Sequence, residues 1–310
     1  MNAKIKISVV IPLYNEEKNI YMLYERLISS LGKINADYEI VFINDGSMDS
    51  TLQIVKEISG KNDKVKYLSF SRNFGHQIAL TAGLRHASGS IIVIMDGDLQ
   101  DPPELISVMV EKWKQGFKVV YAKRTSRRGE GILKKITAKL FYRIVRKLSS
   151  IDIPLDTGDF RLIDRQVVDC LNAMPESNKF LRGQVAWVGF KQTFVEFERE
   201  KRKFGRSNYT LRKMIRFALD GITAFSDMPL KLATILGFIV SGFAFIVILY
   251  ALYSMFVLHR VITGWTSLII STMFIGGIQL LAIGIIGEYI GRIYNNVRKR
   301  PLYVVEESNV

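Results

Sequence analysis

The sequence is poor in cysteine and, over two long segments, in charge. Cys170 is the single cysteine among 310 residues, so an intramolecular disulfide is excluded, as is typical of a reducing compartment. No Lys, Arg, Asp or Glu occurs in Leu232–Leu258 or in Val261–Gly287. A membrane-spanning helix needs about 20 mostly apolar residues, and both segments exceed this length.

These uncharged segments predict two transmembrane helices, at about 232–258 and 264–290, joined by a loop that contains His259 and Arg260. The alternative is a pair of buried core helices, which requires a soluble shell large enough to cover them on all sides.

Several nucleotide-binding and metal-binding patterns are also missing. No G-x-G-x-x-G follows the first predicted strand and no G-x-x-x-x-G-K-[ST] occurs, which argues against a dinucleotide oxidoreductase and a P-loop phosphotransferase. His76 and His86 have no cysteine or histidine partner at metal-binding spacing, so we expect both to be structural. The N-terminal apolar run is too short for a signal peptide, and we expect the bulk of the protein in the cytoplasm.

The formal net charge is +14, and the positions of the basic residues favour a membrane surface over nucleic acid as the partner. They gather beside the predicted spans, in Lys123–Arg128, Lys134–Lys147, Arg199–Arg216 and Arg298–Arg300. Basic flanks stay on the cytoplasmic side and attract anionic headgroups, although any one cluster also fits a solvated basic face. We therefore expect both termini in the cytoplasm, the connecting loop outside and no nucleic-acid partner.

Strand-like and helical patterns alternate over residues 5–122. Strands are predicted at Ile7–Pro12, Tyr38–Asn44, Val65–Phe70, Ile91–Met95 and Phe117–Ala122, with helices at about 16–31, 49–59, 76–87 and 103–115. Such alternation predicts an α/β fold with a mostly parallel sheet covered by helices on both faces. Polar residues follow the strands, among them Asn15, Asp45, Arg72 and Asp96, at the sheet edge where such folds bind ligands.

After residue 122 the pattern changes to basic amphipathic helices, predicted at about 131–150 and 209–225 and suited to a membrane interface. An ordinary helix packed on the sheet fits the first of them nearly as well. Pro229–Leu230 marks a boundary. We expect a catalytic domain over 1–228, a two-helix membrane domain over 229–295 and a cytoplasmic tail over 296–310.

The residues with the clearest chemical meaning follow the apolar strand IIVIM: Asp96-Gly97-Asp98-Leu99-Gln100-Asp101-Pro102-Pro103. Two carboxylates at a strand end are able to share Mg²⁺, which completes its shell with waters and substrate phosphates. Such a metal neutralises the charge that develops on a diphosphate leaving group. The alternative for Asp96 and Asp98 is an Asx turn with a helix cap.

Asn44-Asp45-Gly46-Ser47 follows the second strand, and an acidic side chain there is able to accept hydrogen bonds from a nucleobase or ribose. The alternative is plain turn chemistry in which Ser47 or Asp49 caps a helix.

Seven segments, in this order, resemble the family-2 glycosyltransferases of GT-A fold: VVIPLYNEEKNI, FINDGSMDST, SRNFGHQIALTAGL, DGDLQDPPE, TGDFRLID, FLRG…WVG and RKFGRSNY. Within that family the chain looks like the bacterial polyprenyl-phosphate glycosyltransferases, which resemble dolichyl-phosphate mannose synthase and carry two C-terminal transmembrane helices. The resemblance covers essentially the whole chain. It departs from the common G-E-S-K-Y loop, which is Gly205-Arg206-Ser207-Asn208-Tyr209 here.

The resemblance implies a role for each matching position. The nucleotide-sugar site would comprise Pro12, Tyr14, Glu16, Asp45, Asp96 and Gln100, with Mg²⁺ or Mn²⁺ on Asp96 and Asp98. Asp98 and Asp159 would be the catalytic residues, Asp159 at the place of the family's proposed base. Arg199, Arg202, Arg206 and Ser207 would bind the acceptor phosphate, and arginine suits this because it offers planar bidentate contacts.

The implied reaction is inverting transfer of a hexose, glucose or N-acetylglucosamine, from a UDP-sugar to polyprenyl (undecaprenyl) phosphate at the cytoplasmic membrane face, for cell-envelope glycosylation. A phosphate monoester has a second pKa of about 6, so the acceptor scarcely needs a strong base. Asp159 is then a positioning residue or, alternatively, the cap of a helix over FRLIDRQVVDCL. Homo-oligomers are expected from the family. The other functions considered are a processive polysaccharide synthase, whose Q-x-x-R-W segment is missing, and a non-catalytic membrane scaffold.

Overall fold

The structure is a computed structural model that describes residues 5–125, 157–197, 226, 228–257 and 264–310. Its strands are β1 (Lys6–Leu13), β2 (Asp37–Asn44), β3 (Val65–Phe70), β4 (Ile91–Ile94), β5 (Val119–Arg124), β6 (Thr157–Asp164), β7 (Gln192–Phe197) and β8 (Val305–Ser308). Its helices are α1 (Ile20–Leu31), α2 (Thr51–Lys61), α3 (His76–His86), α4 (Leu105–Lys114), α6 (Arg165–Ala173), α7 (Leu181–Trp187), α9 (Met228–Phe256) and α10 (Trp265–Val297).

The strands form one mixed sheet in the order β7-β5-β6-β4-β1-β2-β3-β8. The pairs β1–β2, β1–β4, β2–β3 and β5–β7 are parallel, whereas β6 runs antiparallel to both β4 and β5, and β8 antiparallel to β3. The predicted α/β fold with a mostly parallel sheet is confirmed, and its early strands lie within about two residues of their predicted ends, the usual uncertainty of such boundaries.

The alternative considered for Asp159, the cap of a helix over FRLIDRQVVDCL, is wrong. The first half of this segment is β6, and α6 begins only at Arg165, where the Asp164 side chain accepts a hydrogen bond from the backbone N–H of Gln166 (3.0 Å). Pairing on both sides with β4 and β5 stabilises the extended form of this segment, a tertiary effect that outweighs its local sequence pattern.

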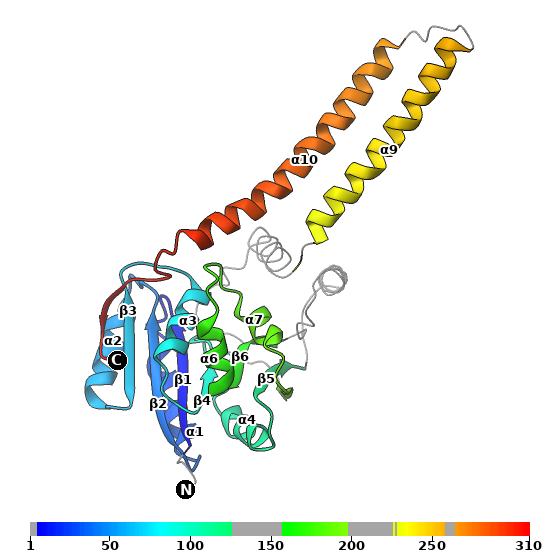
Figure 1. Cartoon of the computed structure of the whole chain (residues 1–310). Coiled ribbons are helices and arrows are strands. Elements are labelled where there is room, and N and C mark those ends of the chain that lie inside the picture. Colours follow the sequence, from blue (N-terminus) through cyan, green and yellow to red (C-terminus); the bar gives the residue numbers. More distant parts are fainter. Residues whose placement is uncertain (1–4, 126–156, 198–225, 227, 258–263) are drawn as a thin grey trace.

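Alternate residues of the central strands belong to two hydrophobic cores, one on each face of the sheet, because successive strand side chains point to opposite faces. Ile7, Val9 and Ile11 of β1 face the core formed with α1, α2 and α4, while Val10 faces the core formed with α3, α6 and α7. Helices therefore cover both faces of the sheet (Figure 1).

A buried carboxylate, Glu39, joins β2 to β1 and to the start of β4. It accepts hydrogen bonds from the Ser8 hydroxyl (2.6 Å) and the Ser88 backbone N–H (2.7 Å), and its Oε2 is 2.9 Å from Lys6 Nζ. Burial opposes its ionisation, but these hydrogen bonds outweigh burial and lower the pKa of Glu39 to about 2. The carboxylate is therefore charged and fixes the register of three strands.

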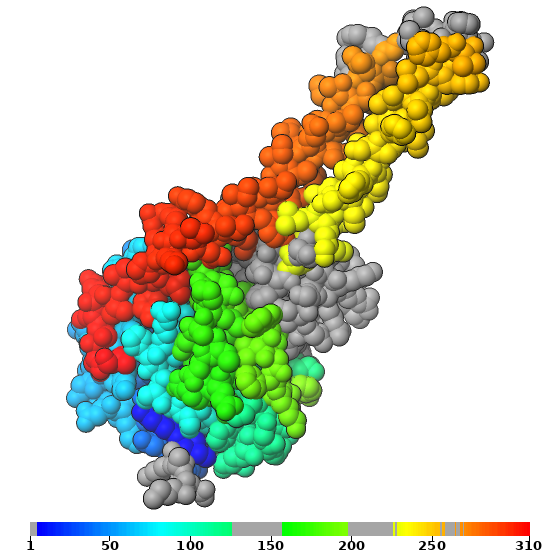
Figure 2. Space-filling view, in the orientation of Figure 1, coloured from blue at the N-terminus to red at the C-terminus, as the bar shows by residue number. Residues whose placement is uncertain are grey.

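Helices α9 and α10 lie side by side and project from the α/β domain (Figures 1 and 2). Met228–Ser254 and Ile270–Val297 are long and apolar enough to cross a membrane, and neither segment is buried in the protein. Pro229 stands in the first turn of α9, where its missing N–H leaves no helical hydrogen bond unmade. The predicted interfacial helices at 131–150 and 209–225 lie outside the described residues.

The segment after α10 returns to the sheet as a strand that the sequence analysis did not predict. β8 pairs antiparallel with β3, the ring of Tyr303 stacks on Phe70 (centroids 5.0 Å apart), and Asn309 Oδ1 accepts a hydrogen bond from the Tyr67 backbone N–H (2.6 Å). This strand covers the edge of β3 and ties the end of α10 to the α/β domain.

Candidate active site

The carboxyl ends of β1, β2 and β4 lie at one edge of the sheet, because these strands are parallel. The antiparallel strand β6 begins at the same edge, since Ile94 at the end of β4 pairs with Arg161 near the start of β6. Side chains that follow β2 and β4 therefore lie close to those at the start of β6. This edge is where sheets of this kind bind ligands.

Three carboxylates occupy the tight turn after β4. Asp98 Oδ1 accepts a hydrogen bond from the backbone N–H of Gln100 (3.1 Å), and Asp101 Oδ2 accepts one from the backbone N–H of Asp96 (3.2 Å). Leu99, between them, has a left-handed φ of 63°, which costs a non-glycine residue about 1–2 kcal/mol. Burial raises the pKa of Asp96, and burial with the charge of Asp96 raises the pKa of Asp101 to about 7.

This turn fits a divalent cation. The Oδ1 atoms of Asp96 and Asp101 are buried and accept no hydrogen bond within the part of the chain that the structure describes. Neighbouring carboxylates that raise each other's pKa are stabilised by a positive ion. No group of three or more His, Cys, Asp or Glu side chains among the described residues is arranged as a complete metal site, so water and substrate phosphate would supply the remaining ligands, as is common for Mg²⁺.

Asp159, in β6, is 6% exposed and is surrounded by cations. Arg182 of α7 donates two hydrogen bonds to its carboxylate (2.8 and 3.0 Å), and Arg161 donates one (3.1 Å). Burial alone would raise the pKa of Asp159, but Arg182 and the hydrogen bond to His76 hold it well below its usual range. The carboxylate is thus an ionised anchor for positive side chains.

His76, expected to be structural, lies in this site instead. Its Nε2 is 3.1 Å from Asp159 Oδ2 and 3.6 Å from Asp96 Oδ1. Desolvation favours the neutral ring, but the hydrogen bond to Asp159 and the charges of Asp96 and Asp159 raise the pKa of His76 to about 9. The imidazolium therefore links the turn after β4 to β6.

Sequence reasoning missed His76 because it searched for histidine at metal-binding spacing, and it missed Arg182 because the FLRG segment carried no assigned role. The available signal was the sequence position of His76 at the start of a helix that follows β3, at the active edge of the sheet.

Asp45, directly after β2, is buried and binds backbone. Its Oδ1 accepts a hydrogen bond from the Phe74 N–H (2.7 Å) and its Oδ2 one from the Gly75 N–H (3.0 Å). Burial raises the pKa of Asp45, an effect that these two hydrogen bonds oppose. The side chain thus holds the loop that leads into α3.

The other predicted donor-site residues lie around the same edge. Pro12 is buried in β1, Tyr14 is 42% exposed beyond its end, and the backbone N–H of Glu16 donates to Thr51 Oγ1 (2.9 Å). Gln100 is half-buried in the turn after β4. The predicted acceptor residues Arg199, Arg202, Arg206 and Ser207 lie outside the described residues.

The structure places an aspartate pair at the carboxyl end of the central strand β4, on a mostly parallel sheet with helices on both faces, an arrangement that fits glycosyltransferases of GT-A fold. The model of the protein family described as "Glycosyl transferase family 2" matches residues 8–171. The chain therefore belongs to glycosyltransferase family 2, as the sequence resemblance predicted.

Relatives extend the similarity over both long helices. The chain is 51% identical to an uncharacterized glycosyltransferase of Bacillus subtilis, YkcC, covering 99% of this chain and 95% of the relative. It is 42% identical to the bactoprenol glucosyl transferase of Shigella phage SfII, covering 98% of each. Among solved structures, glucosyl-3-phosphoglycerate synthase of Mycobacterium tuberculosis with Mn²⁺ and UDP-glucose is 21% identical, with a TM-score of 0.47 over 71% of this chain and 78% of that one.

Proposed function

We propose that this glycosyltransferase moves glucose or N-acetylglucosamine from a UDP-sugar to polyprenyl phosphate, with inversion at the anomeric carbon. The observation that carries the proposal is the 42% identity to a bactoprenol glucosyl transferase over 98% of both chains. That span includes α9 and α10, and a lipid acceptor is consistent with two exposed apolar helices next to the catalytic edge.

We assign the donor to the edge formed by β1, β2 and β4. Asp45, with Pro12, Tyr14 and Glu16, is the proposed site for the base and ribose, since carboxylates at such strand ends accept hydrogen bonds from hydroxyl and amide groups. Asp96 and Asp98, with Gln100 nearby, would hold Mg²⁺ or Mn²⁺, which neutralises charge on the departing diphosphate. The buried Oδ1 of Asp96, which accepts no hydrogen bond from the described residues, supports this assignment.

In the proposed reaction an oxygen of the acceptor phosphate attacks the anomeric carbon as the bond from that carbon to the diphosphate breaks. The acceptor loses no proton that a strong base must take, because much of a phosphate monoester is a dianion near neutral pH. Arg199, Arg202, Arg206 and Ser207 are the proposed acceptor-phosphate contacts.

We propose that Asp159 positions cations rather than accepting a proton. A general base works best with a pKa near the operating pH, whereas Arg182 and His76 hold the pKa of Asp159 well below its usual range. Its bidentate pairing with Arg182 instead fixes a guanidinium close to the carboxylate turn, where a donor diphosphate carries charge.

We further propose that 1–228 is the catalytic domain, that 229–295 spans the bacterial plasma membrane and that both termini are cytoplasmic. The basic segments beside the spans support this orientation. Glycines in α9 and α10, where an added Cβ would meet nothing within 4 Å, suit close packing between copies of the chain, in line with a homo-oligomer.

The test incubates the full chain in membrane vesicles with undecaprenyl phosphate, Mg²⁺ or Mn²⁺ and labelled UDP-glucose, UDP-N-acetylglucosamine or GDP-mannose, followed by lipid extraction. We expect one labelled hexose per lipid from a UDP-sugar, and none after chelation. Asp98→Asn should abolish transfer, whereas Asp63→Asn, an exposed carboxylate before β3, should retain it. No labelled lipid from any donor would overturn the proposal, and a polymeric product would identify a processive synthase instead.

A further inference from the structure

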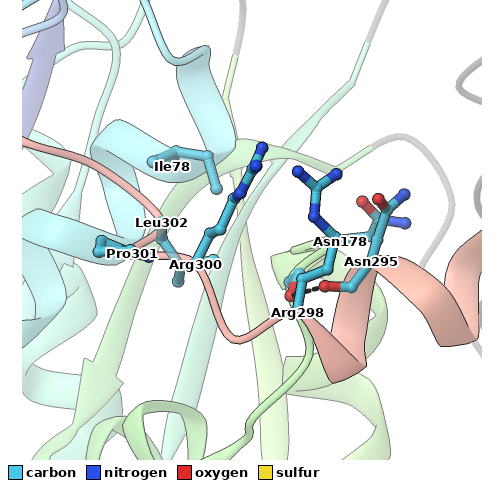
Figure 3. A pocket seen from close by; sticks show the side chains of 8 residues that line it. Ile78, Asn178, Asn295, Arg298, Arg300, Pro301 and Leu302 are labelled. Atoms are coloured by element: carbon cyan, nitrogen blue, oxygen red, sulfur yellow. Dashed lines mark hydrogen bonds between the residues drawn. The ribbon is translucent and has the colours of Figure 1, made fainter.

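A cleft of ≈ 310 Å³ lies where the end of α10 meets the α/β domain (Figure 3). Arg298 and Arg300 line it from the segment that follows α10, Ile78 lines it from α3, and Ser177 and Asn178 line it from the connection between α6 and α7. The volume is enough for a phosphate group with part of its ester substituent, since drug-sized sites begin at about 300 Å³.

The cleft carries positive charge and no negative partner. Figure 3 shows the guanidinium groups of Arg298 and Arg300 pointing to the same side, and no carboxylate is among the lining residues. Over the ranges that the structure describes, neither arginine forms an ion pair, and Arg298 instead lies 5.1 Å from the ring of Tyr294. Two adjacent guanidinium groups repel each other. A phosphate that accepts hydrogen bonds from both offsets this repulsion with its negative charge.

The backbone holds the two arginines in this arrangement. Ser177 donates hydrogen bonds to the Asn296 side chain (2.9 Å, from its N–H) and to the Asn295 carbonyl (3.3 Å, from its hydroxyl), which fixes the end of α10 against the domain. Lys299 then takes a left-handed φ of 48°, a conformation that is unfavourable for a non-glycine residue. This turn directs the chain back over the domain and places Arg300 beside Arg298.

The position of the cleft indicates that a phosphate bound there would belong to a membrane lipid. The apolar span Ile270–Val297 ends one residue before Arg298, so both guanidinium groups lie at the depth of lipid headgroups if α10 crosses the bilayer. Lys and Arg side chains near an anionic membrane surface are attracted to it, and bidentate geometry adds recognition of the phosphate itself.

We propose that Arg298 and Arg300 form a specific binding site for the phosphate ester of a membrane lipid, distinct from the donor edge. The site rests on the membrane placement of α9 and α10 proposed above, and it does not require the sugar transfer. Ile78 stands in the first turns of α3, two residues from His76, so a lipid held here ties the catalytic edge to the membrane surface.

The test measures binding of fluorescent phosphatidylglycerol to the purified full chain in neutral detergent. The variant Arg298→Lys with Arg300→Lys keeps the net charge and loses the planar forks, and we expect its affinity to fall at least tenfold. Arg298→Gln with Arg300→Gln should bind more weakly still. Lys299→Gln removes a neighbouring charge that does not line the cleft and should change affinity less than twofold. Thermal unfolding of each variant verifies the fold.

Equal affinity of wild type and the double lysine variant would overturn the proposal in favour of diffuse charge attraction, as would an equal loss in Lys299→Gln. A competition experiment then distinguishes the two lipids that could supply the phosphate. If undecaprenyl phosphate displaces phosphatidylglycerol, the ligand is the acceptor lipid, and if it does not, the ligand is bulk phospholipid. Both results support a lipid-phosphate site. Binding of inorganic phosphate without lipid binding would contradict it. Lipid binding without sugar transfer would overturn only the proposed function.

Discussion

Replacing Asp159 by asparagine is the most informative single change in the site, because its effect on stability can be worked out from the contacts. The Asp159 carboxylate accepts hydrogen bonds from Arg182 at 2.8 and 3.0 Å and from Arg161 at 3.1 Å. Arg161 is only 1% exposed, so Asp159→Asn leaves a buried cation without its counter-ion. Breaking a buried pair in this way costs about 3–5 kcal/mol.

The expected loss is large enough to measure by thermal unfolding of the full chain in detergent. At roughly 2–4 °C per kcal/mol for a domain of this size, the unfolding midpoint should fall by roughly 6–20 °C. Asp169→Asn is the matched control: Asp169 is 63% exposed in its side chain and lies 3.6 Å from Arg165, an exposed pair worth at most about 1 kcal/mol. Its midpoint should therefore change by no more than roughly 4 °C.

A stable Asp159→Asn protein with a transfer rate reduced a hundredfold would refute this reasoning, since it would show a carboxylate needed for chemistry and not for charge balance. Near-normal turnover in the same variant would contradict both the base and the positioning assignments. The expected combination is a lowered unfolding midpoint together with reduced transfer that Arg182→Lys reproduces only in part, because lysine keeps the charge and loses the bidentate geometry.

Three further outcomes are expected. The pKa of Glu39 is lowered to about 2 from 4.5. Its contribution to the free energy of unfolding, at most about 3 kcal/mol, is therefore present above pH 4.5 and is lost as the pH falls toward 2. Glu39→Gln should make the unfolding midpoint less dependent on pH between these values. Gly46→Ala should destabilise the protein by more than about 1 kcal/mol and raise the donor KM, since Gly46 has φ 66° and an added Cβ would clash with the Arg72 backbone. Tyr303→Ala should lose about 1–2 kcal/mol in chemical unfolding by removing the ring stacked on Phe70, whereas Tyr303→Phe should stay close to wild type.

The N-terminal half of the fold could be predicted because its signals are local. Short β-branched runs alternate with amphipathic helices from β1 to α4, and each polar strand end follows from the same pattern. β6 could not be recognised, since FRLID is compatible with strand or helix until β4 and β5 offer their edges. β8 was missed for the same reason: VEES has little strand propensity and is extended only because β3 has an unpaired edge.

The candidate site divides in the same way. Asp96 and Asp98 could be predicted from two carboxylates after an apolar strand, a pattern within a few residues. The contacts of His76 and Arg182 with Asp159 join positions separated by 83 and 23 residues, and no periodicity encodes such a meeting. The charge state of Asp159 depends on those contacts, so its role as anchor or base could not be decided before they were known.

Long-range contacts also relate the two long apolar helices to the catalytic edge. α10 returns to the domain at Arg298, and the chain then pairs with β3 through β8. Phe70, at the end of β3, is in edge contact with Phe74 (5.7 Å), whose backbone N–H binds Asp45. The segment that follows α10 and the proposed nucleotide site thus both contact the short loop between β3 and α3. The proposed function, which joins a soluble sugar nucleotide to a lipid acceptor, gives a physical reason for this arrangement, because these contacts would hold the catalytic edge near the membrane surface.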